Sequence, residues 1–272
     1  QNQQTVSSDR QFVEPGAEFY LGLSAMDHVI PVGAKISPVV VAIDSDHNLR
    51  TNSLEATIKL FSIQWRPIAY QGAGKTHKFR NEYRLEELRS ERIRTQIPTR
   101  EGIKWNAPPA TNEFATMDKG GHYLLEVSTE DEFGHQVVSS TDFSVSGTNR
   151  VAWDYKNPAH VQLVPDREVY RPGDRARILV KTPIEGHALV SKERNGIHEL
   201  RHEALSGNAP AIEIDITTND APNVFASLTL VRGSEDGPKK FPKPDFRYGY
   251  CELKVEDFTR RLKIELKPEQ KT

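Results

Sequence analysis

The five residues His198-Glu199-Leu200-Arg201-His202 carry the side chains of the zinc peptidase signature HExxH. In that chemistry two imidazoles bind one Zn²⁺, and the glutamate between them acts on the metal-bound water. The spacing works on a helix, where side chains four residues apart lie on one face. On a strand the two histidines would stand about 13 Å apart at ~3.3 Å per residue, which is too far for one metal ion.

The sequence around this motif predicts a strand. Asn195-Gly196 lies directly before the motif, and this dipeptide between two alternating segments is a strong hairpin signal. The sequence EALSGNAPAIE after His202 offers no third ligand at the spacing of a zinc peptidase. We therefore expect an exposed hairpin strand here, and the metallopeptidase is the weaker alternative.

Two acidic clusters follow predicted strands, where carboxylates are ordinary turn residues. The first contains Asp44, Asp46 and His47, and the second is the turn Glu130-Asp131-Glu132. A calcium site at Asp44 and Asp46 is the alternative, but the spacing of an EF-hand is absent. The sequence also lacks a nucleophile elbow and a phosphate-binding glycine loop. We predict no catalytic, cofactor-binding or metal-binding residues and no enzyme activity.

The composition is that of a globular protein without a polyanion-binding surface. The chain has 272 residues, of which 36% are hydrophobic and 27% charged, and its formal net charge is −2. The scattered lysines and arginines predict no nucleic-acid partner, and no apolar run reaches the ~18 residues of a membrane span. The first residues, QNQQTVSSDR, lack an initiator Met and the features of a signal peptide, so we expect an excised piece of a longer protein.

Cys251 is the single cysteine, which excludes a disulfide within the chain. It lies in GYCELKV, an apparent strand, where a buried thiol is expected rather than a nucleophile. The three tryptophans, Trp65, Trp105 and Trp153, lie in or beside predicted strands and are expected to pack in the core or between domains.

Alternation with a period of two residues dominates the chain and predicts an all-β protein. Segments bounded by Gly, Pro, Asn or Asp are the expected strands: 17–24, 37–44, 54–65, 121–129, 137–147, 160–166, 176–182, 187–194, 211–217, 223–233 and 249–257. Their number and spacing favour antiparallel sandwiches over one barrel. A helix competes only in EYRLEELRSERIRT, residues 82–95, because Leu85 and Leu88 also fit one helical face.

A domain boundary is expected near Gly147-Thr148-Asn149, after which a new alternating run begins with a turn at Arg171–Asp174. In the first half, Pro31-Val32-Gly33 precedes the predicted strand 37–44 much as Pro172-Gly173 precedes the strand 176–182. This similarity suggests two copies of one domain type. We predict a tail at 1–11, a sandwich at 12–148, a second sandwich at 149–258 and a linker at 259–272. Trp153 is expected to pack the two domains together.

The second sandwich carries an ordered set of motifs: YRPGDRARILVKTP, ALVSKERNGI, IEIDIT, APNVFASLTLVRG and YCELKVED. This set closely resembles the macroglobulin-type β-sandwich domain of bacterial alpha-2-macroglobulins across residues 149–258. The resemblance of residues 12–148 is looser and rests on PVG before a strand, the FSIQW strand and the G-x-Y-x-L-x-V strand.

The resemblance implies a string of such domains that acts as a broad-spectrum endopeptidase inhibitor, with a bait segment and, in many members, a thioester in a C-x-E-Q motif. This chain has no C-x-E-Q, since Cys251 is followed by Glu-Leu-Lys. Asn219–Pro222 is too short for a bait, and Ser234–Gly249 is the longest candidate, expected instead to be an extended hairpin connection. By the order of the family's domains, the bait is expected in the domain after Thr272.

We therefore expect a fragment of a protease trap that serves as scaffold. The family implies neighbouring macroglobulin-type domains as partners, target proteases bound through the parent protein, and a periplasmic or extracellular location. The alternative is a tandem β-sandwich module for adhesion or carbohydrate binding, which an exposed aromatic patch on one domain would favour.

Overall fold

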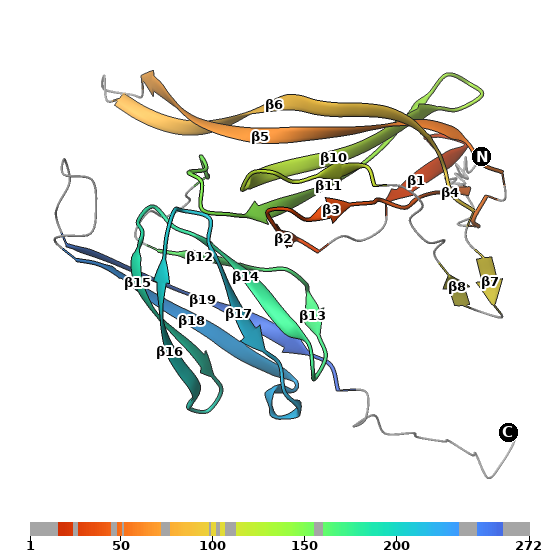
Figure 1. Ribbon diagram of the computed structural model, residues 1–272. Coiled ribbons are helices and arrows are strands. Elements are labelled where there is room, and N and C mark those ends of the chain that lie inside the picture. Colours follow the sequence, from red (N-terminus) through yellow and green to blue (C-terminus); the bar gives the residue numbers. More distant parts are fainter. Residues whose placement is uncertain are drawn as a thin grey trace, which may run out of the picture.

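The computed structural model describes residues 16–23, 27–44, 48–50, 52–71, 77–97, 99–101, 104–106, 113–154, 160–233 and 244–257. Within these ranges the chain forms two β-sandwiches in tandem (Figure 1), so the predicted all-β fold class is confirmed. The one helical element in the described ranges is a 3-10 turn, η2 (Thr218–Asp220). None of the described helical structure is therefore long and apolar enough to cross a membrane.

The first sandwich is built on a five-stranded sheet that buries alternate residues of its central strands. Its order is β2 (Val29–Pro31), β11 (Gln136–Ser146), β10 (Gly121–Glu130), β5 (Glu55–Gln71) and β6 (His77–Arg94). Facing it are the strand pairs β1 (Phe19–Leu23) with β4 (Val40–Asp44) and β3 (Lys35–Ile36) with β9 (Ala115–Thr116). A further pair joins β7 (Thr99–Glu101) to β8 (Lys104–Asn106). Alternate side chains of β5 and β10 fill the core, with Ile58, Leu125 and Val127 completely buried.

The segment at 82–95, where a helix competes in the sequence, belongs to the long strand β6 as far as Arg94. It pairs with β5 along the whole strand, and a register shift between Leu60 and Phe61 leaves Leu88 without a direct partner. Because β10 pairs only with Thr57–Ser62, the distal parts of β5 and β6 continue as a two-stranded ribbon beyond the rest of the sheet (Figure 1). The helical spacing of Leu85 and Leu88 therefore reflects a bulge rather than a helical face.

The second sandwich places a three-stranded sheet against a five-stranded one. The first contains β12 (Gln162–Pro165), β14 (Arg175–Lys181) and β17 (Ala211–Asp215). The second has the order β13 (Val169–Tyr170), β19 (Asp245–Val255), β18 (Asn223–Arg232), β15 (Gly186–Glu193) and β16 (Ile197–Leu205). The core between the sheets is aliphatic except for Tyr170, which is completely buried.

The predicted turn at Arg171–Asp174 leads into β14. Gly173 has a φ of +96°, which glycine adopts readily, and the Asp174 amide donates to the Arg171 carbonyl at 2.9 Å. The Asp174 carboxylate accepts from the Arg171 amide at 2.8 Å. The turn chemistry that the sequence indicates thus positions the first long strand of the second sandwich.

Candidate functional site

The HExxH motif lies on β16, in the hairpin that the sequence predicts. Asn195 adopts a φ of +53° and Gly196 one of +149°, and the Arg194 amide donates to the Gly196 carbonyl at 2.9 Å. Along β16 the burial alternates, with Glu199 less exposed than Leu200 and His202. Glu199 and His202 therefore point to opposite faces of the sheet, which is incompatible with the geometry of a zinc peptidase.

Glu199 and His202 contact different neighbouring side chains rather than a shared site. The Glu199 carboxylate accepts from Arg201 Nη1 at 2.7 Å. The His202 ring stacks on His187 with centroids 5.2 Å apart. The described residues contain no group of three or more His, Cys, Asp and Glu side chains arranged to hold a metal ion.

A β-bulge turns His198 toward a buried ion pair. The register between β15 and β16 shifts at Lys192/Glu193, so His198 has no cross-strand partner, and its Nδ1 lies 3.9 Å from Asp220 Oδ1. Asp220 Oδ2 accepts from Lys192 Nζ at 3.1 Å and from Thr217. Burial raises the pKa of Asp220, but these hydrogen bonds outweigh it and hold the pKa below its usual range. The ion pair of Lys192 with Asp220 therefore stabilises the η2 turn, and we assign it a structural role.

The acidic turn after β10 is a structural cap. Asp131 accepts hydrogen bonds from the amides of Glu18, Phe133 and His135 at 3.2, 3.0 and 2.8 Å and contacts the His135 ring at 2.9 Å. Burial raises the pKa of Asp131, but the hydrogen bonds from His135, Glu18 and Phe133 outweigh it and lower this pKa to about 2. In the other cluster, Asp44 accepts from the Asn48 amide at 2.8 Å, whereas Asp46 and His47 lie outside the described residues.

Cys251 is a half-buried residue of β19, on the side of the strand that faces the core. Burial raises the pKa of its thiol to about 12, so it stays protonated and unreactive at neutral pH. The interpretation of this residue as a structural thiol agrees with its surroundings.

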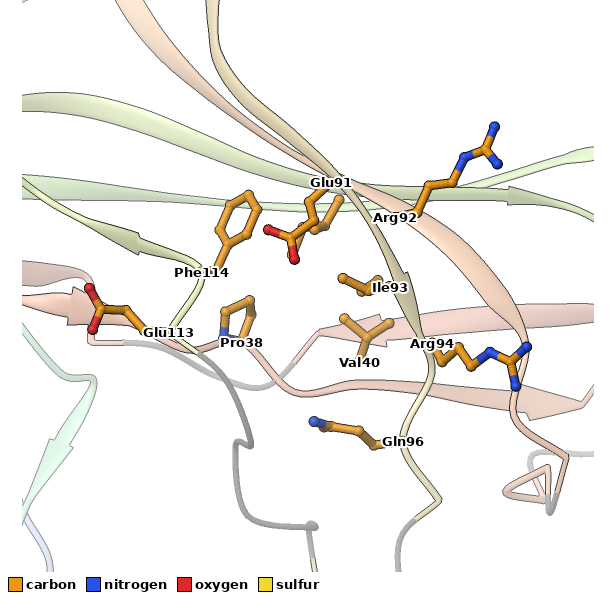
Figure 2. Close-up of a pocket in the computed structure, with 10 residues that line it drawn as sticks. Pro38, Val40, Glu91, Arg92, Ile93, Arg94, Gln96, Glu113 and Phe114 are labelled. Carbon is orange, nitrogen blue, oxygen red and sulfur yellow. The ribbon is translucent and has the colours of Figure 1, made fainter.

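A cavity of 320 Å³ opens at the side of the first sandwich, between the end of β6 and β4 (Figure 2). Its apolar lining includes Val40, Ile93 and Phe114, and the Glu91 side chain points toward these residues, whereas the Arg92 side chain points away from them (Figure 2). The cavity brings together no pair of groups positioned for acid–base or nucleophilic chemistry.

The outer face of the second sandwich carries exposed aromatic side chains. Phe246, Tyr248 and Tyr250 occupy alternate positions of β19 and are 63%, 48% and 70% exposed. Phe225 on the neighbouring β18 lies edge-to-face against Tyr250, with ring centroids 6.5 Å apart. We call the outward side chains of β18 and β19 the aromatic face.

Only part of the aromatic face was foreseen from the sequence. Residues 249–257 are a predicted strand, but β19 begins at Asp245, within the segment expected to be a connection. The alternation of aromatic residues at 246, 248 and 250 with Arg247 and Gly249 was the signal for the longer strand. Residues 234–243 of that candidate bait lie outside the described residues.

The two sandwiches meet at a compact junction around Trp153. Trp153 is 6% exposed and packs with Val29 of the first sandwich and with Leu179 and Ala209 of the second. Its indole Nε1 donates to the Asn208 carbonyl at 2.9 Å. The expectation that Trp153 packs between the domains is met, whereas Trp65 lies on β5 against Tyr83, and the side chain of Trp105 lies outside the described residues.

Polar contacts surround this apolar centre. The amide of His28 donates to the Asp166 carbonyl at 2.6 Å, and Asp27 forms an ion pair with Arg167 at 3.1 Å. Lys181 Nζ lies 4.6 Å from the centroid of the Trp153 ring, a cation–π contact.

Comparison with known proteins supports the resemblance seen in the motifs. Residues 161–272 match the family model of the alpha-2-macroglobulin bait region domain, which confirms the predicted resemblance to alpha-2-macroglobulins. A search of curated protein sequences finds no match.

Solved structures similar to the chain include alpha-2-macroglobulin of Escherichia coli in its native conformation, with 16% identity and a TM-score of 0.34 over 92% of this chain and 16% of that one. A Salmonella alpha-2-macroglobulin mutant has 16% identity and a TM-score of 0.33, over 90% of this chain and 15% of the mutant. Dimeric latent PorU of Porphyromonas gingivalis has 7% identity and a TM-score of 0.27, over 89% of this chain and 24% of the PorU chain. The chain thus spans about one sixth of the length of these alpha-2-macroglobulins.

Proposed function

From the match of residues 161–272 to the alpha-2-macroglobulin bait region domain, we propose that this chain is a segment of an alpha-2-macroglobulin-type endopeptidase inhibitor. In that role the two sandwiches, at 12–148 and 149–258, form a scaffold of the protease trap, flanked by a tail at 1–11 and a linker at 259–272. In this proposal the segment itself carries out no catalysis and holds no cofactor or metal ion.

The junction supports a scaffold role. A segment that transmits movement in a trap must keep its two domains in a defined relation, because a loose linker would absorb the displacement. Here Trp153 is buried between them, and hydrogen bonds and an ion pair join the strands on each side. Movement of one sandwich would therefore carry the other with it.

The described part of the region that matches the bait region domain does not itself resemble a bait. A protease needs an extended, accessible segment, whereas residues 161–233 and 244–257 form paired strands joined by short turns. Nor can Cys251 form the family's thioester, because it lacks the C-x-E-Q sequence and its thiol is half-buried. We propose that the cleaved bond lies outside the described residues.

The partners and the location follow from the same proposal. The segment contacts neighbouring macroglobulin-type domains of its parent protein, and target proteases bind through that parent. An inhibitor of foreign proteases acts in the periplasm or outside the cell, and the net charge of −2 offers no attraction to nucleic acid.

Mixing this chain with trypsin separates a scaffold from a complete trap. The chain alone is expected to leave trypsin activity unchanged at any ratio, whereas the parent protein that carries this segment should block cleavage of a protein substrate. A stoichiometric loss of trypsin activity with the chain alone would refute the scaffold role.

The junction can be tested within the parent protein. Trp153→Ala should lower the fraction of trypsin that the parent traps, while the control Phe133→Ala changes an aromatic side chain that is 76% exposed on the turn after β10 and should leave trapping unchanged. Equal trapping by both variants would show that the junction has no part in the movement.

A further inference from the structure

The aromatic face has the features of a ligand-binding surface that the scaffold role does not use. Soluble proteins rarely leave several large aromatic side chains exposed side by side, because each exposes apolar area to water. The three rings of β19 span about 13 Å, at ~3.3 Å per residue over four residues. All three are on the side of β19 that faces away from the core, and the Tyr248 ring lies edge-to-face against His160 with centroids 4.6 Å apart.

Hydroxyl groups accompany the aromatic rings along this face. In the register of β18 and β19, Ser227 lies opposite Tyr250, and Thr229 lies opposite Tyr248. Both hydroxyl residues are on the outward side of β18. The face therefore presents a row of apolar ring surfaces beside a row of hydrogen-bonding groups.

A cavity of 550 Å³ lies at one end of this row, beside the Asn195-Gly196 turn. Its apolar wall includes Phe225, Tyr250 and Ile197. Its polar groups include Asn223 and Glu193, and Asn223 Nδ2 donates to Glu252 at 2.7 Å. Cavities of this size that combine aromatic walls with a few polar groups are typical of small-ligand sites.

The charges and hydrogen bonds of the cavity restrict what it can bind. The carboxylate of Glu193 lines the cavity, and that of Glu252 is bonded to the lining residue Asn223, so both disfavour an anionic ligand. The cationic Arg194 is directed to the backbone carbonyls of Asn219 and Ala221. β18 is paired with β15 and β19 from Phe225 to Val231, so it offers no free strand edge to an extended peptide. On its other side β19 pairs with β13 at Lys254 and Val255 and has an isolated bridge from Tyr248 to His160.

We propose that the aromatic face binds a neutral oligosaccharide, with one sugar ring in the cavity against Tyr250 and further rings along Tyr248 and Phe246. A sugar ring has an apolar C–H face that stacks on an aromatic ring and a rim of hydroxyls for the amide and carboxylate groups. This site goes beyond the scaffold role and is independent of it.

Calorimetric titration of the chain with cellotetraose, chitotetraose and maltotetraose tests the proposal. At least one of these neutral tetrasaccharides should give saturable binding. Tyr250→Ala should weaken that binding about tenfold, because it removes one stacking surface. Tyr250→Phe keeps the ring and should retain most of the affinity.

The matched control is Tyr83→Ala, which removes a tyrosine of similar exposure, 61%, from the ribbon of the first sandwich and should leave binding unchanged. Circular dichroism should give the same spectrum for all variants, because both tyrosines face solvent. The absence of saturable binding with all three sugars, or equal binding by wild type and Tyr250→Ala, would overturn the proposal. So would self-association of the chain that Tyr250→Ala abolishes, because the face would then be a protein interface.

Discussion

Replacing Trp153 with alanine should separate the motions of the two sandwiches. The indole is 6% exposed and lies between side chains of both domains, so its removal leaves a cavity at the junction. A buried aromatic residue covers about 200 Å², which at ~25 cal/mol per Å² corresponds to about 5 kcal/mol. Because the junction can partly close the cavity, we expect a loss of about 3–5 kcal/mol in the free energy of unfolding.

Two measurements test the predicted loss of stability in Trp153→Ala. Urea unfolding should show a lower midpoint for Trp153→Ala than for wild type, and small-angle scattering should show a larger radius of gyration as the domain angle loosens. The control Trp153→Phe keeps most of the apolar contact but leaves the Asn208 carbonyl without its indole donor at 2.9 Å. Its cost should be smaller, with about 1 kcal/mol from the lost hydrogen bond.

Unchanged scattering for Trp153→Ala would refute this reasoning. In that case the polar contacts at the edge, such as the ion pair of Asp27 with Arg167, would hold the domains without the indole. A scattering change as large in Trp153→Phe as in Trp153→Ala would instead assign the effect to the hydrogen bond.

Three further predictions concern stability. Asp131→Asn should lower the urea midpoint at neutral pH, and the difference from wild type should vanish between about pH 4 and about pH 2, because a lowered carboxylate pKa stabilises the fold only while the group is ionised. Asp220→Ala should lower the free energy of unfolding in urea by about 3–5 kcal/mol, because the buried Lys192 ammonium loses its carboxylate partner. The double variant that also carries Lys192→Met should regain most of this stability. Gly207→Ala should lower the free energy of thermal unfolding by about 2 kcal/mol or more, because its φ is +75° and a Cβ would lie 2.5 Å from the carbonyl oxygen of Thr148. The control Gly173→Ala has a φ of +96° but open space around the added Cβ, so it should lower this free energy by about 1 kcal/mol.

Local signals in the sequence were sufficient for much of the fold. The Asn195-Gly196 hairpin and the Arg171–Asp174 turn depend on backbone conformations that these residue types favour, so the structure agrees with them. Alternation identified the central strands because each buries one face. The same logic resolved HExxH, whose side chains alternate between two faces of β16.

The rest depended on tertiary contacts that local patterns do not contain. Residues 82–94 form a strand because β5 pairs with them, and a bulge at Leu88 interrupts the strand alternation between the two leucines. The bulge at Lys192 likewise directs His198 toward Asp220, which is distant in sequence. The length of β19 depends on β18, because Asp245–Tyr248 become a strand by pairing with Thr229–Arg232.

The distribution of side chains indicates that this segment acts through its surfaces. The residues that could do chemistry are engaged in structural contacts: Glu199 binds Arg201, Asp131 caps its turn, and the Cys251 thiol is held protonated. The aromatic residues of β19 contact only neighbouring rings in the described part of the chain and keep much of their surface exposed, so they cannot catalyse a reaction but can hold a ligand. The two proposed roles, transmission of movement through the junction and binding of a ligand on the aromatic face, can be separated by substituting Trp153 and Tyr250 independently.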